Sequence, residues 1–111
     1  MAEKYRIVIL PEAQRDIREI VDYIAGELAA PQAARRLVSA FEQEVRSLAL
    51  MPKRVRLVDE QPWRDRGIRR TRVKNYYVYY LVDDEQSAVQ VLAMIYTGRD
   101  QEAQLRERDH V

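Results

Sequence analysis

The sequence contains no cysteine and a single histidine, His110, close to its C-terminal end. Without cysteine the chain has no disulfide framework, no thiol nucleophile and no thiolate metal site. A Ser-His triad or a histidine metal cluster would have to recruit its histidine from that end of the chain. We therefore expect neither a metal ion nor any other cofactor.

Long apolar runs are also missing. No apolar segment approaches the roughly 20 residues that a membrane-spanning helix requires, and the first residues enter a strand-like run almost at once. We expect no signal peptide, no membrane anchor and a cytoplasmic protein. Gly98 stands alone after a strand-like run, without the spacing of a phosphate-binding glycine loop.

An overall excess of charge of one sign is absent as well, because 19 Lys and Arg residues oppose 18 Asp and Glu residues. Net charge therefore gives no indication of nucleic-acid binding. The distribution is uneven, however: the segment 53–74 holds nine bases and three acids, whereas the segment 1–52 holds seven bases and eight acids. This local excess predicts one positive face, formed by one loop and one strand.

The first half of the chain shows one strand and two helices. The β-branched run Tyr5–Leu10 predicts a strand that Pro11 ends, because proline cannot donate to a sheet ladder. Apolar residues then recur at helical spacing from Glu12 to Leu28 and again from Ala34 to Ala49, with a break at residues 29–31. This pattern predicts a helical hairpin, and the segment 52–62 that follows reads as a mostly exposed connection.

The second half shows three strands. Residues 68–73 and 76–82 flank a tight turn at Lys74-Asn75, and residues 88–96 are apolar on both alternating faces, as in a central strand. The order β-α-α-β-β-β predicts an α+β fold in which the helical hairpin packs on a small, mainly antiparallel sheet. We expect one domain over 1–111, with a core at about 5–100 and a charged tail at 101–111 in which Leu105 anchors a helical turn.

The predicted strand 68–73 carries the densest arginine cluster. Side chains alternate along a strand, so Arg70 and Arg72 share one face while Arg69 and Thr71 share the other. Guanidinium groups suit phosphate, and a tyrosine beside them could stack a base, so RNA fits such a surface. An acidic protein surface would fit it equally well, and arginines that simply decorate a solvated face are the third interpretation.

Several segments together resemble the RelE/ParE toxins, and the resemblance spans nearly the whole chain. The segments are Tyr5–Ile9, the helix with Ala13, Asp16, Ile17, Ile20 and Tyr23-Ile24, then Pro52, Gly67–Arg70, Val73–Tyr80 and Ile95–Asp100. Its most specific parts are the strand-turn-strand segment that ends in Tyr79-Tyr80 and the final strand that runs into Gly98-Arg99-Asp100. The resemblance implies a toxin of a type II toxin–antitoxin system (plasmid stabilisation family). It also implies a cognate antitoxin, whose C-terminal segment covers the working surface in a toxin–antitoxin hetero-oligomer.

The RelE/ParE superfamily includes two activities. RelE-like members cleave mRNA in the ribosomal A site, whereas ParE-like members poison DNA gyrase and are not nucleases. If this chain is an enzyme, the resemblance implies a metal-independent endoribonuclease (mRNA interferase) with four catalytic candidates: Arg72, Arg99, Tyr80 and Tyr96. Its candidates for binding the target or RNA phosphate are Lys53, Arg54, Arg56, Arg70 and Lys74.

The residues near the C-terminal end help to distinguish between the RelE-like and ParE-like activities. RelE-like nucleases commonly carry a tyrosine or histidine there for proton transfer, but this chain offers only His110 after Asp100. RNA cleavage through the 2′-hydroxyl needs a base and a leaving-group acid, and arginine serves neither role well. We therefore favour a ParE-like growth inhibitor acting on DNA gyrase, with the ribosome-dependent mRNA endoribonuclease as the alternative.

Overall fold

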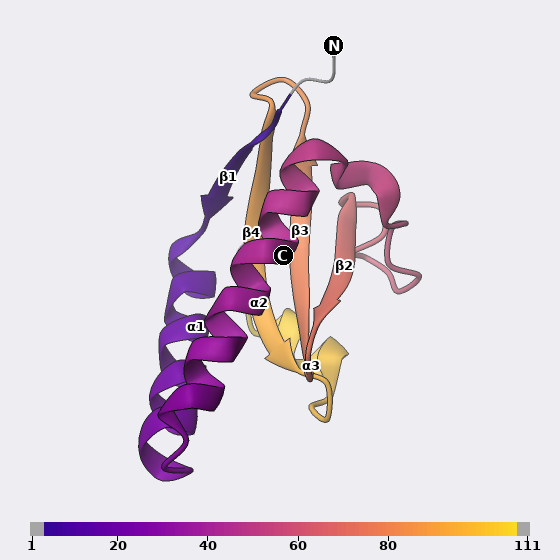
Figure 1. Ribbon diagram of the computed structural model, residues 1–111. Helices are drawn as coiled ribbons and strands as arrows, with labels where there is room; N and C mark the ends of the chain where they lie inside the picture. Colours follow the sequence, from indigo (N-terminus) through magenta and orange to yellow (C-terminus); the bar gives the residue numbers. More distant parts are fainter. Residues whose placement is uncertain (1–3, 109–111) are drawn as a thin grey trace.

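The computed structural model describes residues 4–108, and it has the predicted order of elements. Two long helices, α1 (Pro11–Asp22) and α2 (Pro31–Leu50), cover one face of a four-stranded sheet (Figure 1). A short helix, α3 (Gln101–Arg106), and the loop that precedes the second strand supply apolar side chains to the other face. No helix within residues 4–108 is long and apolar enough to cross a membrane.

The sheet has the strand order β1-β4-β3-β2, where β1 is Arg6–Ile9, β2 Ile68–Val73, β3 Tyr76–Asp83 and β4 Ala88–Tyr96. Only the β1–β4 pair is parallel, which confirms the mainly antiparallel sheet and the central position of β4. Because β1 pairs only with residues 88–91, the remainder of β4 has no strand neighbour on that edge. Helix α1 packs against this remaining part of β4.

Strand β4 contains a bulge, which shifts the alternation of its side chains between the two faces of the sheet. Tyr79 pairs with Ala93 and Tyr80 with Val91, so Leu92 is the extra residue of the ladder. As a result Leu92 and Ala93 both pack on the α3 side, whereas Val91 and Met94 both pack on the side of α1 and α2.

A widened helical segment and a very short loop connect the two helices of the hairpin. Both α1 and α2 begin with proline, whose missing N–H costs nothing in the first helical turn. The regular helix predicted as far as Leu28 widens after Asp22 into a π-helical segment, η1 (Tyr23–Glu27), in which the Leu28 N–H donates to the Tyr23 carbonyl. Ala29 then takes a left-handed φ of 49°, and Pro31 starts α2.

The sheet carries a core on each face. On one face Val78 and Met94 pack with Leu37 and Phe41 of α2; on the other, Trp63 packs with Leu105 of α3. The helical turn predicted around Leu105 is therefore confirmed. The segment 52–62, predicted as a mostly exposed connection, is exposed only in part. Pro52 starts a short 3-10 turn, η2 (Pro52–Arg54), and both Pro52 and Val58 are buried.

Candidate functional site

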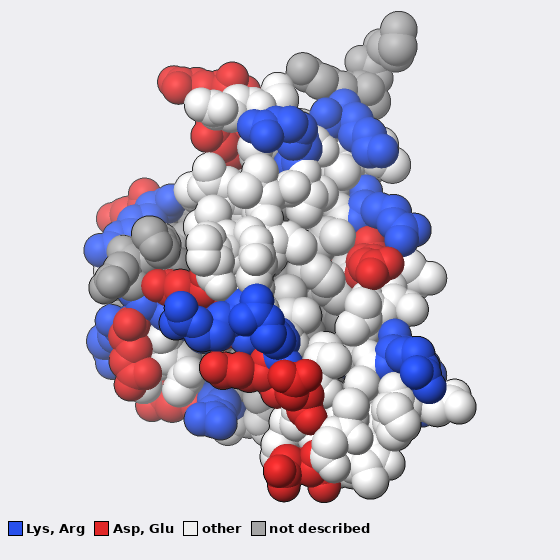
Figure 2. Space-filling model, turned by 90° about the vertical axis from the view of Figure 1, so that its left-hand side faces the viewer, with Lys and Arg blue, Asp and Glu red and all other residues white. Residues whose placement is uncertain are grey.

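The basic candidate residues lie at opposite ends of the sheet. Lys53 contacts Asp84, just beyond the end of β3, whereas Lys74 precedes the start of β3 and Arg99 follows the end of β4. The prediction of one positive face is wrong, because the segment 53–74 runs the length of β2 and places its ends far apart. Figure 2 shows both signs of charge close together on the face that carries α1, with no single positive patch on that side of the molecule.

The three candidates at the β3–β4 turn end are all paired with acids. The pairs are Lys53 with Asp84 (2.7 Å), Arg54 with Glu44 (2.9 Å) and Arg56 with Asp59 (3.4 Å). The hydrogen bond to Asp84 raises the pKa of Lys53 and lowers the pKa of Asp84. Each of these three bases therefore already has an acidic partner within the folded chain.

Tyr80, proposed as catalytic in a nuclease, lies in the core. Its side chain is fully buried, and its hydroxyl donates a hydrogen bond to the Pro52 carbonyl at 2.7 Å. Burial raises its pKa to about 12. A hydroxyl that is buried, bonded to a carbonyl and this weakly acidic cannot exchange protons with a bound RNA.

The arginines of β2 alternate as predicted. Arg69 donates to the Val55 carbonyl on the side of α2, and Thr71 on the same side hydrogen-bonds Glu44. On the opposite face the Arg70 guanidinium stacks on the Tyr77 ring, 4.1 Å from its centroid. Arg72 is exposed, and its Nε donates to the Lys74 carbonyl at 2.8 Å.

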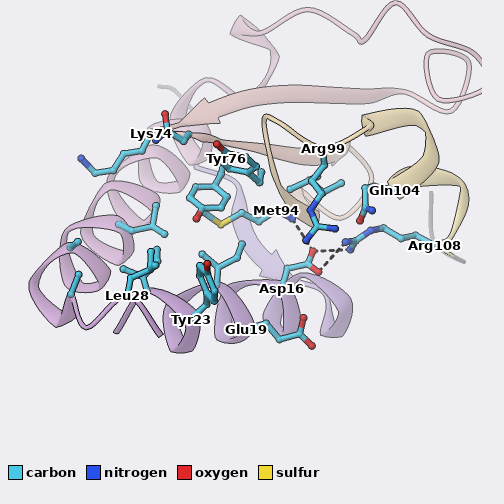
Figure 3. Close-up of a pocket in the computed structure, with 18 residues that line it drawn as sticks. Asp16, Glu19, Tyr23, Leu28, Lys74, Tyr76, Met94, Arg99, Gln104 and Arg108 are labelled. Atoms are coloured by element: carbon cyan, nitrogen blue, oxygen red, sulfur yellow. Dashed lines mark hydrogen bonds and ion pairs between the residues drawn. The ribbon is translucent and has the colours of Figure 1, made fainter. Parts of the chain in front are cut away.

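A groove of about 1030 Å³ lies at the end of the sheet where Lys74 and Arg99 are found. One wall consists of α1, η1 and the start of α2, and the other consists of the β2–β3 turn, the end of β4 and the C-terminal segment (Figure 3). Three large apolar or aromatic lining side chains are about half exposed: Tyr23 (55%), Leu28 (55%) and Tyr96 (51%). Grouped in one groove, these side chains make it a candidate binding surface.

The sheet-side wall is fixed by contacts between the β2–β3 turn and the end of β4. The Thr97 N–H donates to the Asn75 carbonyl at 2.9 Å, and the Tyr76 and Tyr96 rings meet edge to face with centroids 5.9 Å apart. Gly98 makes room for this arrangement, because a Cβ there would lie 2.5 Å from Cε2 of Tyr96. Lys74 and Arg99 are thereby held on one rim of the groove.

Asp16 closes one end of the groove. Its carboxylate accepts hydrogen bonds from the Met94 N–H (2.9 Å) and from both terminal nitrogens of Arg108 (2.7 and 3.0 Å). The Met94 N–H lies on the part of β4 that β1 leaves unpaired, so Asp16 takes the place of a strand neighbour. Lys74 and Arg99, by contrast, form no ion pair with any acid within residues 4–108.

Sequence reasoning placed Lys74, Arg99 and Tyr96 among the candidates but missed the groove itself. It assigned Leu28 to the apolar stripe of a helix, and only the hairpin geometry leaves Leu28 uncovered. It also gave no role to Arg108, whose partner is 92 residues away in the sequence. Among the described residues, no group of three or more His, Cys, Asp or Glu side chains could hold a metal ion; His110 lies outside them.

Comparison with known proteins gives one family and several similar folds. The family model described as the ParE toxin of the type II toxin–antitoxin system parDE matches residues 7–101. No curated protein has a sequence similar enough to count as a match.

Two solved structures illustrate the fold similarity. A chain in the chromosomal ParDE toxin–antitoxin system of P. aeruginosa is 16% identical with a TM-score of 0.67, covering 85% of this chain and 97% of that one. A chain in the toxin–antitoxin complex RelBE2 of Mycobacterium tuberculosis is 20% identical with a TM-score of 0.62, covering 86% of this chain and 94% of that one. At these identities the likeness establishes the fold, which is common to ParE-named and RelE-named systems.

Proposed function

The chain belongs to the ParE toxin family of type II toxin–antitoxin systems, and from this membership we propose that it inhibits growth by acting on DNA gyrase and is neutralised by a cognate antitoxin. The observation that carries the proposal is the groove at the β2–β3 turn end. Its rim bears Lys74 and Arg99 without acidic partners, and its lining includes the exposed side chains of Tyr23, Leu28 and Tyr96. A surface of this composition suits a protein partner.

The chemistry available in the described residues supports a binding poison over a nuclease. RNA cleavage needs a proton acceptor and a proton donor beside the cations that hold the phosphate. Tyr80 is buried and bonded to Pro52, and Lys53 is paired with Asp84 at the far end of the sheet. Asp16, the carboxylate at the end of the groove, already accepts three hydrogen bonds.

One observation favours the alternative of a ribosome-dependent mRNA endoribonuclease. Arg72 donates a hydrogen bond to the Lys74 carbonyl, and Lys74 lines the same groove as Arg99 and the half-exposed Tyr96. In this alternative the three bases would bind RNA phosphates and Tyr96 would transfer a proton. To bind RNA as well, Lys53, Arg54 and Arg56 would have to exchange their acidic partners for phosphate, and Arg70 stacks on the Tyr77 ring.

Expression in a bacterial host separates the two functions. The protein is induced with and without the adjacent antitoxin gene, while an SOS-response reporter and the 5′ ends of mRNA are followed in parallel. The gyrase proposal predicts growth arrest with reporter induction and intact mRNA, and rescue by the antitoxin. In-frame mRNA cuts without reporter induction would establish the nuclease instead, and unimpaired growth would refute both functions.

A further inference from the structure

Two arginines lie at the Asp16 end of the groove, and only one of them is bonded to the Asp16 carboxylate. Both Arg99 and Arg108 line the groove with Asp16, and Figure 3 shows the Arg99 side chain directed toward this carboxylate. Arg108 donates to it from both terminal nitrogens, at 2.7 and 3.0 Å. Arg99 forms no ion pair with any acid of residues 4–108. A single anion thus has one guanidinium bound to it and a second one directed toward it.

The geometry of Asp16 explains why Arg108 holds this position. Each carboxylate oxygen accepts a hydrogen bond from one nitrogen of Arg108, and Oδ2 also accepts the Met94 N–H at 2.9 Å. A bidentate arginine–carboxylate pair is among the strongest ion-pair geometries. The side chains of Asp16 and Arg108 are each 14% exposed, whereas Arg99 is an exposed residue. While Arg108 is bound, both oxygens of Asp16 are therefore already engaged.

Separate contacts hold the backbones of the two arginines in place. The Arg108 N–H donates to the Leu105 carbonyl at 3.1 Å, and Leu105 is buried in the core on the α3 face. The side-chain amide of Gln101 donates to the Arg99 carbonyl at 2.9 Å. Because both backbones are fixed beside the same carboxylate, one guanidinium can replace the other there by a change of side-chain conformation alone.

We propose that Arg108 is a positioning residue: by occupying Asp16 it keeps the Arg99 guanidinium free to bind an anionic group of the target. Without Arg108, the Asp16 carboxylate would be a largely shielded charge that lacks its cation, and Arg99 would take the vacant place. A guanidinium paired within the chain is not available to a partner, so the binding-competent fraction would fall. This inference rests on the proposed function, because it concerns the binding of gyrase through Arg99.

Inhibition of gyrase supercoiling by the purified full chain tests this role. Arg108→Ala should raise the concentration needed for half inhibition by about fivefold, because Arg99 would then be paired with Asp16 for most of the time. Adding Asp16→Asn to Arg108→Ala should restore inhibition to within about twofold of the parent chain. The neutral amide of asparagine can still accept the Met94 N–H, but it does not form an ion pair with Arg99.

A further double variant shows whether Arg108 acts through Arg99. Arg99→Ala combined with Arg108→Ala should inhibit gyrase as weakly as Arg99→Ala alone, because there is then no Arg99 side chain to release. Arg106→Ala is the matched control, since Arg106 belongs to the same C-terminal segment, pairs with the exposed Glu102 and does not line the groove. This control should leave inhibition unchanged. Circular dichroism and urea denaturation establish that each variant is folded.

The chemical reactivity of Arg99 reports its pairing without gyrase. Phenylglyoxal modifies accessible guanidinium groups, and mass spectrometry of the full chain after digestion gives the rate at each arginine. Arg99 should react about fivefold more slowly in Arg108→Ala than in the parent chain, and at the parent rate once Asp16→Asn is added. Arg35 is the internal reference, because it is exposed on α2 and does not line the groove.

Three outcomes would overturn the inference. They are unchanged Arg99 reactivity in Arg108→Ala, no recovery of inhibition when Asp16→Asn is added, and an additive loss in the Arg99 and Arg108 double variant, which would place Arg108 in direct contact with the target. If the parent chain leaves gyrase unimpaired, the gyrase proposal fails, whereas the reactivity of Arg99 still decides whether Arg108 controls its pairing.

Discussion

The Asp16 carboxylate on α1 forms two hydrogen bonds with the Arg108 guanidinium, 2.7 and 3.0 Å long, between residues 92 positions apart in the sequence. The same carboxylate accepts the Met94 N–H on the open part of the β4 edge. One side chain thus joins the first helix, the central strand and the C-terminal segment, and all three border the groove.

Replacing Asp16 should destabilise the fold. Asp16→Ala leaves a backbone N–H and a guanidinium, both largely shielded from solvent, without their acceptor, so we expect a loss of about 2 kcal/mol of unfolding free energy. Urea denaturation measures it. Glu19→Ala on the same helix is the control and should change stability by less than about 0.5 kcal/mol, because Glu19 is exposed. Equal losses in both variants would contradict the role given to Asp16.

Substituting Tyr80 should affect stability and not toxicity. Tyr80→Phe leaves the Pro52 carbonyl without its donor, at a cost of about 1 to 2 kcal/mol. Growth arrest on induction should be unchanged, because the hydroxyl is buried. A loss of toxicity in a variant that remains folded would instead indicate a catalytic role for Tyr80.

Tyr80 also predicts an alkaline limit to stability. In the folded chain its pKa is about 12, against the ordinary tyrosine value of 10.0, so the folded state keeps a proton that the unfolded state releases. The unfolding free energy should therefore fall as the pH rises above 10.0. Urea denaturation of the parent chain and of Tyr80→Phe at several alkaline pH values measures this, and the fall should be smaller in the variant. Identical pH profiles would contradict it.

The basic residues that line the groove and those that are paired with acids at the other end of the sheet should differ in their effect on toxicity. Arg99→Ala removes an unpaired cation from the groove and should weaken growth inhibition by about tenfold in the inducer dose required. Lys53→Ala removes a cation that is paired with Asp84 at the far end of the sheet and should have little effect. The reverse order of effects would place the working surface at the β3–β4 turn end.

Trp63 should be essential to the second core. Its side chain is 2% exposed and packs with Leu105 and Tyr79 on the α3 face of the sheet. Trp63→Ala should cost about 3 to 5 kcal/mol of unfolding free energy, whereas Trp63→Phe should retain most of the packing. A small loss for Trp63→Ala would mean that the loop before β2 does not close this face.

The order of elements could be predicted because each depends on local chemistry. β-branched runs, helical spacing and proline fix the strands and helices of the hairpin, and the two apolar faces of Ala88–Tyr96 place β4 in the centre of the sheet. The alternation of Arg69, Arg70 and Arg72 follows from strand geometry alone.

The site could be predicted only in part because it depends on contacts between distant segments. Whether Lys53 is a free cation is decided by Asp84, 31 residues later, and Leu28 stays exposed because the hairpin widens at η1. The loop before β2 has no period, so its contribution of Trp63 to the core was not predicted. Elements from both ends of the chain form the groove, so no local sequence pattern could predict it.

Action on gyrase is tested most directly by the supercoiling of relaxed plasmid DNA by purified gyrase in the presence of the purified full chain. We expect that supercoiling is inhibited and that cleaved DNA accumulates, that Arg99→Ala weakens both effects, and that Lys53→Ala does not. Unimpaired gyrase, together with mRNA cuts in a purified translation system containing the same protein, would contradict the proposed function.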